Sequence, residues 1–409
     1  MGSQGSIAEV HCWSLLPKNR INLVSRKICS VQPLRAVENS ARLKSTMELD
    51  TTGCALIDGS LLEGGGQILR TAVALSALKD APVRIIKIRA GRKDPGLKSQ
   101  HLKGIELVRQ MCDGSLEGGS MGSTEITFRP GRIKAGSFYA DAVTAGSVSL
   151  MMQVLLPLAL FAPGPTNFEL KGGTNADLAP PVDHTVLAYR HMLEKFGGDF
   201  KAQIKTRGYF PKGRGEVLVS VSPVRSLKGV TLTDFGEVKR VFGFSFVSGK
   251  FPSHLADSMT RYVERVLKND PVLRKNCAEI KSTSSDKAFG DGFGIVLGCE
   301  TTTGCLLVTS SCNKRGYRAE DAAKEAVEEL VSSVNIQSCV DQHTQDQVII
   351  LMALAVGESK LRTGPITMHT KTVMHFTEKL LGVKFVVYAI DDEVNIIECT
   401  GSGFQNPNF

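Results

Sequence analysis

Apolar residues along this chain recur with two spacings, one typical of half-buried strands and one typical of amphipathic helices. Short apolar runs predict strands at residues 55–58, 83–89, 124–129, 166–171, 201–206 and 215–222. Segments with helical periodicity predict helices at residues 67–79, 99–112, 143–161 and 183–197. Because strands and helices alternate, we expect layered sheets with helices packed on them.

The alternation of strands and helices described above changes near Val224 and resumes near Cys339. From Gly229 to about Ser333 the predicted order is strand, strand, helix, strand, strand, helix, which is self-contained. After Cys339 the sequence predicts helices at 341–357 and 369–381 and strands at 359–363, 384–389 and 394–399. The expected class is therefore α/β, of the layered α+β kind, with a large domain of repeated helix-on-sheet units.

The composition is that of a globular protein without a membrane span. Of the 409 residues 42% are hydrophobic, and the longest apolar run, 154–162, contains Pro157 and is shorter than the roughly 20 residues that a membrane helix needs. Ten cysteines form no CxxC pair, which favours reduced thiols in an intracellular compartment. Cys299, Cys305 and Cys312 lie close in sequence but lack the spacing of zinc ligands.

Residues 1–46 differ from the rest of the chain. They are rich in serine and basic residues, contain only two acids, Glu9 and Glu38, and show no sustained periodicity. This composition predicts either a disordered leader or an organellar transit peptide, and Met47 could serve as an internal start.

Positive charge is concentrated between Arg84 and Gly104. This segment carries seven Lys or Arg residues and a single acid, Asp94, a net of +6, whereas the whole chain has a net charge of +8. Such a segment favours an anionic partner, a polyphosphate or a nucleic acid. The alternative is a solvated basic face that binds nothing.

A run of three glycines at 64–66 precedes the first predicted helix. Backbone N–H groups at a helix N-terminus attract phosphate or carboxylate, and Gln67 and Arg70, three residues apart, project from one face of the first turn. No Gly-Lys-Ser/Thr follows, so the turn is not a Walker A loop, and it does not match GxGxxG. With Glu63 in front of it, the turn indicates a phosphate-binding site.

Six blocks of the sequence resemble, in order, blocks of the RNA 3′-terminal phosphate cyclase family, in its class I, catalytic and eukaryotic branch. They are EGGGQILR, IRAGRKDPGLKSQHL, AGSVSLMMQVLLPLAL, KGGTNADLAPPVDH, RGYFPKGRGEV and TMHTKTVMHF. The resemblance runs from about Ala55 to Phe409. It implies ATP-dependent conversion of an RNA 3′-phosphate into a 2′,3′-cyclic phosphate through a covalent enzyme–AMP intermediate and an RNA-adenylate. It also implies a small inserted α/β domain at 227–335 within a catalytic domain of 47–226 and 336–409.

Covalent nucleotidyl transfer needs a nucleophile with a free lone pair near neutral pH. His369 follows Thr367, an expected N-cap, so the helix dipole disfavours its protonated form. It also matches the position of the family's nucleophile. His375 lies on another helical face and is expected to be structural. The resemblance assigns a functional role to Asp346, which could orient His369.

The resemblance places further residues around the nucleotide. Those expected to bind ATP or phosphate are Gln67, Arg70, Arg89, Arg92, Gln100, His101, Pro180 and His343. Glu63 is the expected ligand of Mg²⁺ or Mn²⁺; its alternative role is an acid at a helix N-terminus. A purine pocket is expected at Thr174, Asn175, Pro180 and Pro181. The chain departs from the family at His343, where the family has tyrosine, and at Arg214, where it has glycine; a positive φ at Arg214 would cause strain.

The expected partners are ATP and RNA with a 3′-phosphate end, with no membrane association. The sequence leaves open whether the protein is a monomer or a homodimer. The expected location is the nucleus, or an organelle or the cytoplasm if the leader is a transit peptide. Two other functions remain as alternatives: a non-catalytic cyclase-like factor in ribosome biogenesis, and a general phosphate-binding transferase. The histidine at 369 and the complete EGGGQ block favour the enzyme.

Overall fold

A computed structural model describes residues 49–285, 288–314 and 316–409. The predicted leader, residues 1–46, lies outside the described residues, as does Met47. Among the described helices, none has the length and apolar character needed to cross a membrane.

Three groups of elements follow one another along the chain, each with helices between its strands. The first group is β1 (Ala55–Asp58), α1 (Gly66–Lys79), β2 (Val83–Ile86), α2 (Ser99–Met111), β3 (Ser115–Glu117) and β4 (Ile126–Arg129). The second is β5 (Gly136–Asp141), α3 (Val148–Ala159), β6 (Thr166–Gly172), α4 (Val182–His184), the π-helix η1 (Thr185–Tyr189), α5 (Arg190–Phe196), β7 (Phe200–Gly208) and β8 (Gly215–Val221). The third is β9 (Thr231–Leu232), α8 (Gln342–Leu354), β15 (Glu358–Thr363), α9 (Met368–Leu381), β16 (Phe385–Ala389) and β17 (Asn395–Thr400).

The sheets of these three groups share one strand order. They run β1-β2-β4-β3, β5-β6-β8-β7 and β9-β15-β17-β16. Among these strands, the first two in each sheet are parallel and the other neighbouring pairs are antiparallel. The prediction of repeated helix-on-sheet units in a layered α/β fold is thus confirmed.

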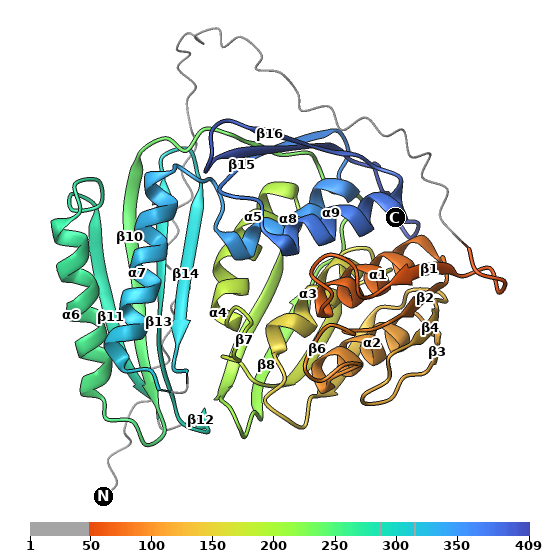
Figure 1. Cartoon of the computed structure of the whole chain (residues 1–409), viewed down its shortest axis with the longest axis horizontal. Coiled ribbons are helices and arrows are strands. Elements are labelled where there is room, and N and C mark those ends of the chain that lie inside the picture. The colour runs from red at the N-terminus through yellow and green to blue at the C-terminus, as the bar shows by residue number, and fades with distance from the viewer. Residues whose placement is uncertain (1–48, 286–287, 315) are drawn as a thin grey trace, which may run out of the picture. The chain divides into compact units, whose positions relative to one another are not determined.

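A fourth sheet interrupts the third group between β9 and α8 (Figure 1). Its elements are β10 (Val238–Ser248), α6 (His254–Asn269), β11 (Cys277–Ser285), β13 (Gly292–Thr301), β14 (Leu306–Cys312) and α7 (Ala319–Asn335); β12 (Ala288–Phe289) instead joins β7. The strand order is β11-β10-β13-β14, and α6 and α7 pack on it side by side. The predicted limits of the inserted domain, 227–335, stay a prediction; β9 pairs with β15 of the third sheet.

The structure differs from the predicted elements in several places. Strands β3 and β5 were not predicted, since they carry few of the apolar residues that mark a strand. The strand predicted at 83–89 ends at Ile86, because Lys87 and Arg89 have φ of 52°, outside the strand region. The helix predicted at 143–161 begins only at Val148, where the hydroxyl of Ser147 caps it by accepting from the N–H of Leu150.

Helices form the centre of the region built from the three groups. Helix α1 contacts α3 and α9, and α8 contacts α9 (Figure 1). Both α1 and α8 are buried on most of their faces, as expected of helices that pack between other layers. The glycine turn before α1 meets side chains of both α2 and α9, and a side chain of α8 meets the start of α9.

Candidate active site

The glycine turn before α1 leaves little room for side chains of its own. Gly64 has φ of +59°, and a Cβ at Gly65 would lie 2.2 Å from the Glu63 carboxylate. A Cβ at Gly66 would lie 2.4 Å from Nε2 of His101. The turn therefore holds a carboxylate and an imidazole directly against the start of α1.

His101 and Gln100 come from the first turn of α2. Nδ1 of His101 accepts a hydrogen bond from the N–H of Lys98 at 3.2 Å, so in the neutral ring Nε2 carries the proton and faces the glycine turn. Burial and the positive charge of Arg70 lower the pKa of His101 to about 3. The imidazole is therefore a neutral donor at physiological pH. Gln100 accepts from the N–H of Ser147 at 2.8 Å and so joins α2 to the start of α3.

Arg70 is the central charge of the site. One of its terminal nitrogens donates to the side-chain oxygen of Gln67, while its Nε is buried without a partner. Burial lowers the pKa of Arg70 to about 10, against the opposing effect of Asp346 and Glu63, so the guanidinium stays charged at neutral pH. An unpartnered N–H of a buried cation is suited to an anionic ligand.

Two cavities meet at Arg70. The larger is lined by Gln67, Arg70, Thr71, Gln153, Pro157, Tyr189, Asp346, Gln347 and Ile350. The smaller is lined by Leu69, Arg70, Gln100, His101, Gly104, Ile105, Leu150 and Val154. The side-chain oxygens of Thr71, Gln153 and Gln347 in the larger cavity are buried and have no hydrogen-bond partner. Since a buried polar atom without a partner costs free energy, these oxygens mark a binding surface for hydrogen-bond donors.

Gln153 and Gln347 were missed by the sequence reasoning. Gln153 lies inside the apolar run of α3, and that polar residue among apolar ones was the available signal. Gln347 directly follows Asp346, and its amide nitrogen donates to the carbonyl of His343 at 2.6 Å. That hydrogen bond leaves the amide oxygen of Gln347 free in the cavity.

Asp346 is buried on α8 beside Arg70. Burial raises the pKa of Asp346 to about 7, although the charge of Arg70 opposes the rise. Among the described residues no hydrogen bond joins Asp346 to His369, so the structure does not show the expected direct orienting contact. The positive charge of Arg70 acts on both Asp346 and His369, and in each case it favours the deprotonated form.

Replacement of Asp346 by asparagine is expected to stabilise the fold at alkaline pH. The raised pKa means that the folded protein retains a proton which the unfolded chain releases, so stability is lost as the pH rises from about 4 to 7. Asparagine removes that loss, which amounts to at most about 4 kcal/mol. Thermal midpoints measured from pH 5 to 9 should show the variant's advantage growing up to about pH 7–8. A constant difference, or the same trend in the exposed control Asp392→Asn, would contradict the assignment.

His343 lies on the first turn of α8 and faces His184. Their rings meet edge to face at 5.6 Å, and Nε2 of the fully buried His184 lies 2.9 Å from the carboxylate of Asp341, the N-cap of α8. Burial and the nearby His184 lower the pKa of His343 to about 4. His343 is therefore neutral at physiological pH.

His369 is the second residue of α9, as the sequence predicts. The hydroxyl of Thr367 accepts from the N–H of Thr370 at 3.0 Å, and the amide oxygen of Gln345 accepts from the N–H of Thr367 at 3.1 Å. This clamp fixes the start of α9 while the side chain of His369 stays exposed. Partial desolvation and the guanidinium groups of Arg70 and Arg92 lower the pKa of His369, against the effect of Glu63. The imidazole is therefore neutral at pH 7 and accessible to a substrate.

Glu63 joins the glycine turn to α9 and to the basic segment. Its N–H donates to the hydroxyl of Thr372 at 3.2 Å, and Arg92 donates to its carboxylate and to its carbonyl oxygen. The second carboxylate oxygen is buried without a partner. No group of three or more His, Cys, Asp or Glu suited to a metal occurs among the described residues. Glu63 thus fits a cation that takes its other ligands from water and phosphate, as Mg²⁺ commonly does.

Arg89 and Arg92 occupy different environments. Arg89 donates to the carbonyl oxygens of Asp94 at 2.7 Å and Gly96 at 2.9 Å, so its guanidinium closes the turn of the basic segment. Arg92 is exposed and reaches the glycine turn. Of the two, Arg92 is better placed to meet a phosphate beside Glu63.

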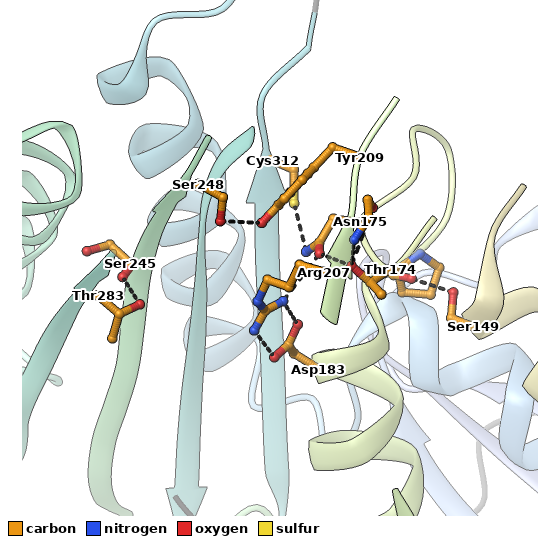
Figure 2. Close-up of polar contacts among 12 residues, drawn as sticks. Ser149, Thr174, Asn175, Asp183, Arg207, Tyr209, Ser245, Ser248, Thr283 and Cys312 are labelled. Atoms are coloured by element: carbon orange, nitrogen blue, oxygen red, sulfur yellow. Dashed lines mark hydrogen bonds and ion pairs between the residues drawn. The ribbon is translucent and has the colours of Figure 1, made fainter. Parts of the chain in front are cut away.

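The residues expected to line a purine pocket are engaged elsewhere. The carbonyl of Pro180 accepts from the hydroxyl of Ser149 at 2.6 Å, and the side chain of Asn175 bonds Thr174, Arg207 and Cys312 (Figure 2). None of the four expected residues lines the two cavities at Arg70.

Arg214 has φ of +57°. The left-handed conformation costs an L-residue about 1–2 kcal/mol, so this arginine is strained where glycine would not be. The question that the sequence left open is thereby answered in favour of strain.

Comparisons with known proteins agree with the sequence resemblance. Residues 61–387 match the family described as RTC: RNA 3′-terminal phosphate cyclase. An RNA 3′-terminal phosphate cyclase of Pyrobaculum aerophilum is 38% identical over 329 residues, 80% of this chain and 93% of that protein. Proteins of the same name from Drosophila melanogaster and Ignicoccus hospitalis are 37% identical over 350 residues and 41% identical over 326 residues. These matches cover 86% and 80% of this chain and 97% and 92% of the respective relatives.

Proposed function

The chain belongs to the RNA 3′-terminal phosphate cyclase family, and we propose that it uses ATP to convert an RNA 3′-phosphate into a 2′,3′-cyclic phosphate. One observation carries the proposal: a neutral, accessible His369 lies at the start of a helix, where the charge of the buried Arg70 acts on its imidazole. Nucleotidyl transfer requires this combination of a free nucleophile and preorganised positive charge.

In the first step the lone pair of His369 attacks the α-phosphorus of ATP. A P–N bond forms, the bond to the β-phosphate oxygen breaks, and pyrophosphate leaves. Arg70 and the neutral N–H of His101 are the donors that would stabilise charge on the phosphoryl oxygens. The unpartnered oxygens of Gln153 and Gln347 would accept hydrogen bonds from the amino group or hydroxyls of the nucleoside.

In the second step an oxygen of the RNA 3′-phosphate attacks the same phosphorus, and the imidazole of His369 leaves in exchange. In the third step the adjacent 2′-hydroxyl attacks the 3′-phosphorus, a P–O bond forms, its proton passes to solvent or a base, and AMP leaves. Because AMP is a better leaving group than hydroxide or oxide, adenylation makes the cyclisation feasible.

A divalent cation, Mg²⁺ or Mn²⁺, would be held by Glu63. When bound, such an ion neutralises phosphate charge and orients the triphosphate. The fit rests on the buried carboxylate oxygen that has no partner. Arg92, now bonded to the other carboxylate oxygen, would turn toward phosphate when the cation takes its place.

The proposal is tested with the full chain, α-labelled ATP, Mg²⁺ or Mn²⁺, and an oligoribonucleotide with a labelled 3′-phosphate. We expect label on the protein with ATP alone and, after RNA is added, a 3′ end that resists phosphatase until mild acid opens the ring. A protein that gains no label and leaves the 3′-phosphate sensitive to phosphatase would overturn the proposed function.

A further inference from the structure

Three loops of the second group form one surface, which we call the loop rim: residues 142–147, 173–181 and 209–214. The N–H of Gly173 donates to the carbonyl of Gly146 at 2.8 Å, and the N–H of Thr174 to that of Gly208 at 2.9 Å. A Cβ at Gly213 would lie 2.2 Å from the carbonyl oxygen of Thr144. The loops are therefore in backbone contact with one another.

The loop rim adjoins the candidate active site. The hydroxyl of Ser99 donates to the carbonyl of Ala142, and the N–H of Ser147 donates to the side chain of Gln100 at 2.8 Å. Gln100 lines the smaller cavity together with Arg70 and His101. A polymer with its end at Arg70 would consequently meet the loop rim.

Large apolar side chains of the loop rim point into solvent. Phe210 is 74% exposed, Val143 is 73% exposed, and Leu178 is fully exposed. The preceding residue, Tyr209, is only 2% exposed, and its hydroxyl lies 3.3 Å from that of Ser248 on β10. Two adjacent aromatic residues are thus used differently: Tyr209 anchors the hairpin and Phe210 is presented to a partner.

The base of the hairpin is held rigidly. Arg207 forms a two-pronged ion pair with Asp183 at 2.7 and 2.8 Å (Figure 2). Its guanidinium lies over the ring of Phe246, 4.9 Å from the ring centroid. A Cβ at Gly208 would lie 2.3 Å from the backbone nitrogen of Gly215, so the two strands approach too closely for a larger residue. A rigid support lowers the entropy lost when the tip binds a ligand.

The tip of the hairpin carries positive charge and strain. Lys212 and Arg214 are exposed, and no acidic residue occurs between Arg207 and Gly215. Arg214, Val143 and Leu178 all have φ near +60°, which is rare for residues other than glycine and especially so for valine. Strained residues of this kind cluster at binding sites, where the contacts they make offset the cost.

We propose that the loop rim binds the single-stranded RNA just upstream of its 3′ end, with Phe210 stacked on a base and Lys212 and Arg214 at the flanking phosphates. The inference rests on the proposed cyclase function. Single-stranded RNA is bound by aromatic side chains that stack on bases and by basic residues that follow the backbone, and the loop rim offers both. A purely apolar protein partner would leave the two exposed cations without a role.

A double-mutant cycle between the protein and the RNA tests the stacking. Phe210→Ala is combined with 3′-phosphate oligoribonucleotides that lack one base at each successive position, and the dissociation constant is measured by fluorescence anisotropy. We expect Phe210→Ala to weaken binding about 5- to 150-fold, the range for loss of one stacked base. Removal of one base near the 3′ end should weaken wild-type binding but add nothing in the variant. Phe210→Tyr should keep the affinity.

Controls separate this inference from the cyclase function. Tyr388→Ala removes an aromatic side chain that is 39% exposed on β16 and should leave RNA affinity unchanged. Enzyme–AMP formation from ATP alone involves no RNA and reports on the cyclase function independently. If the protein forms enzyme–AMP and cyclises RNA but Phe210→Ala binds every oligonucleotide as the wild type does, the loop rim proposal fails and the cyclase function stands. If the loss in Phe210→Ala is the same whichever base is missing, stacking is refuted.

The interaction of Arg214 with phosphate has its own readout. Arg214→Gly removes the charge and the backbone strain together, so the variant should be folded. Its RNA affinity should fall, and the slope of log affinity against log salt should decrease by about 0.7, the amount expected for one neutralised phosphate of a single strand. An unchanged slope would remove Arg214 from the RNA surface.

Discussion

Replacement of Arg70 by alanine is expected to lower the rate of enzyme–AMP formation by about 10²–10³-fold, the usual effect of losing one preorganised donor to transition-state charge. Arg70 is the only residue that lines both cavities at the site, and its buried Nε has no partner in the described structure. The rate is measured in a single turnover with labelled ATP. Arg132→Ala, which removes an exposed arginine outside the site, is the control and should keep the wild-type rate.

The pH dependence of the same variant distinguishes catalysis from folding. Arg70 lowers the pKa of His369, so its removal should raise that pKa toward the ordinary value of 6.5. Because His369 reacts in its neutral form, the rate of Arg70→Ala should begin to fall at a higher pH than that of the wild type. Arg70→Lys keeps the charge and should leave this acid limb near the wild-type position. An Arg70→Ala protein with a native melting profile and a normal rate would refute the central role of Arg70.

The sequence predicts the layers of this fold because its signals are local. Runs of apolar residues mark α1 and α8, apolar periodicity marks α9, and the three glycines mark a turn in which a Cβ would meet Glu63 or His101. Strands β3 and β5 lack that signal, since three of six residues in β5 are exposed and only one is buried. These two strands form because they pair with β4 and β6, and such tertiary pairing leaves no local signal in the sequence.

The cavity at Arg70 could not be predicted in the same way. Gln153 lies in an apolar stretch of α3 and Gln347 on the buried α8, and they face one space only after α1, α3 and α8 have packed. The same holds for Asp346, whose pKa depends on Arg70 and on His184 from the second group. For Arg89 the sequence predicts a contact with phosphate. The structure adds hydrogen bonds from its guanidinium to two backbone carbonyls, which close a turn and could not be predicted from charge alone.

Replacement of His369 by alanine is expected to lower ATP-dependent labelling by at least about 10³-fold, because no P–N bond can form without the imidazole. The variant should still bind ATP, since Glu63, Arg70 and the cavity at Gln153 do not depend on this exposed side chain. His375→Ala is the matched control: it removes a histidine six residues later on α9, where the ring packs beside Phe376, and should retain labelling.

The chemistry of the label identifies the nucleophile independently of the variant. A phosphoramidate on histidine should be labile in acid and stable in alkali, which separates it from a serine or threonine ester. The His369→Ala protein, given RNA that already carries a 3′-adenylylated phosphate, should still release AMP and form the cyclic phosphate. That step uses the 2′-hydroxyl and the charge of Arg70, with no need for an imidazole nucleophile. If His369→Ala keeps its label, the nucleophile lies elsewhere. His101 lies against the glycine turn, but its ring is buried and its Nδ1 already accepts from Lys98, so the lysines of the basic segment would be tested first.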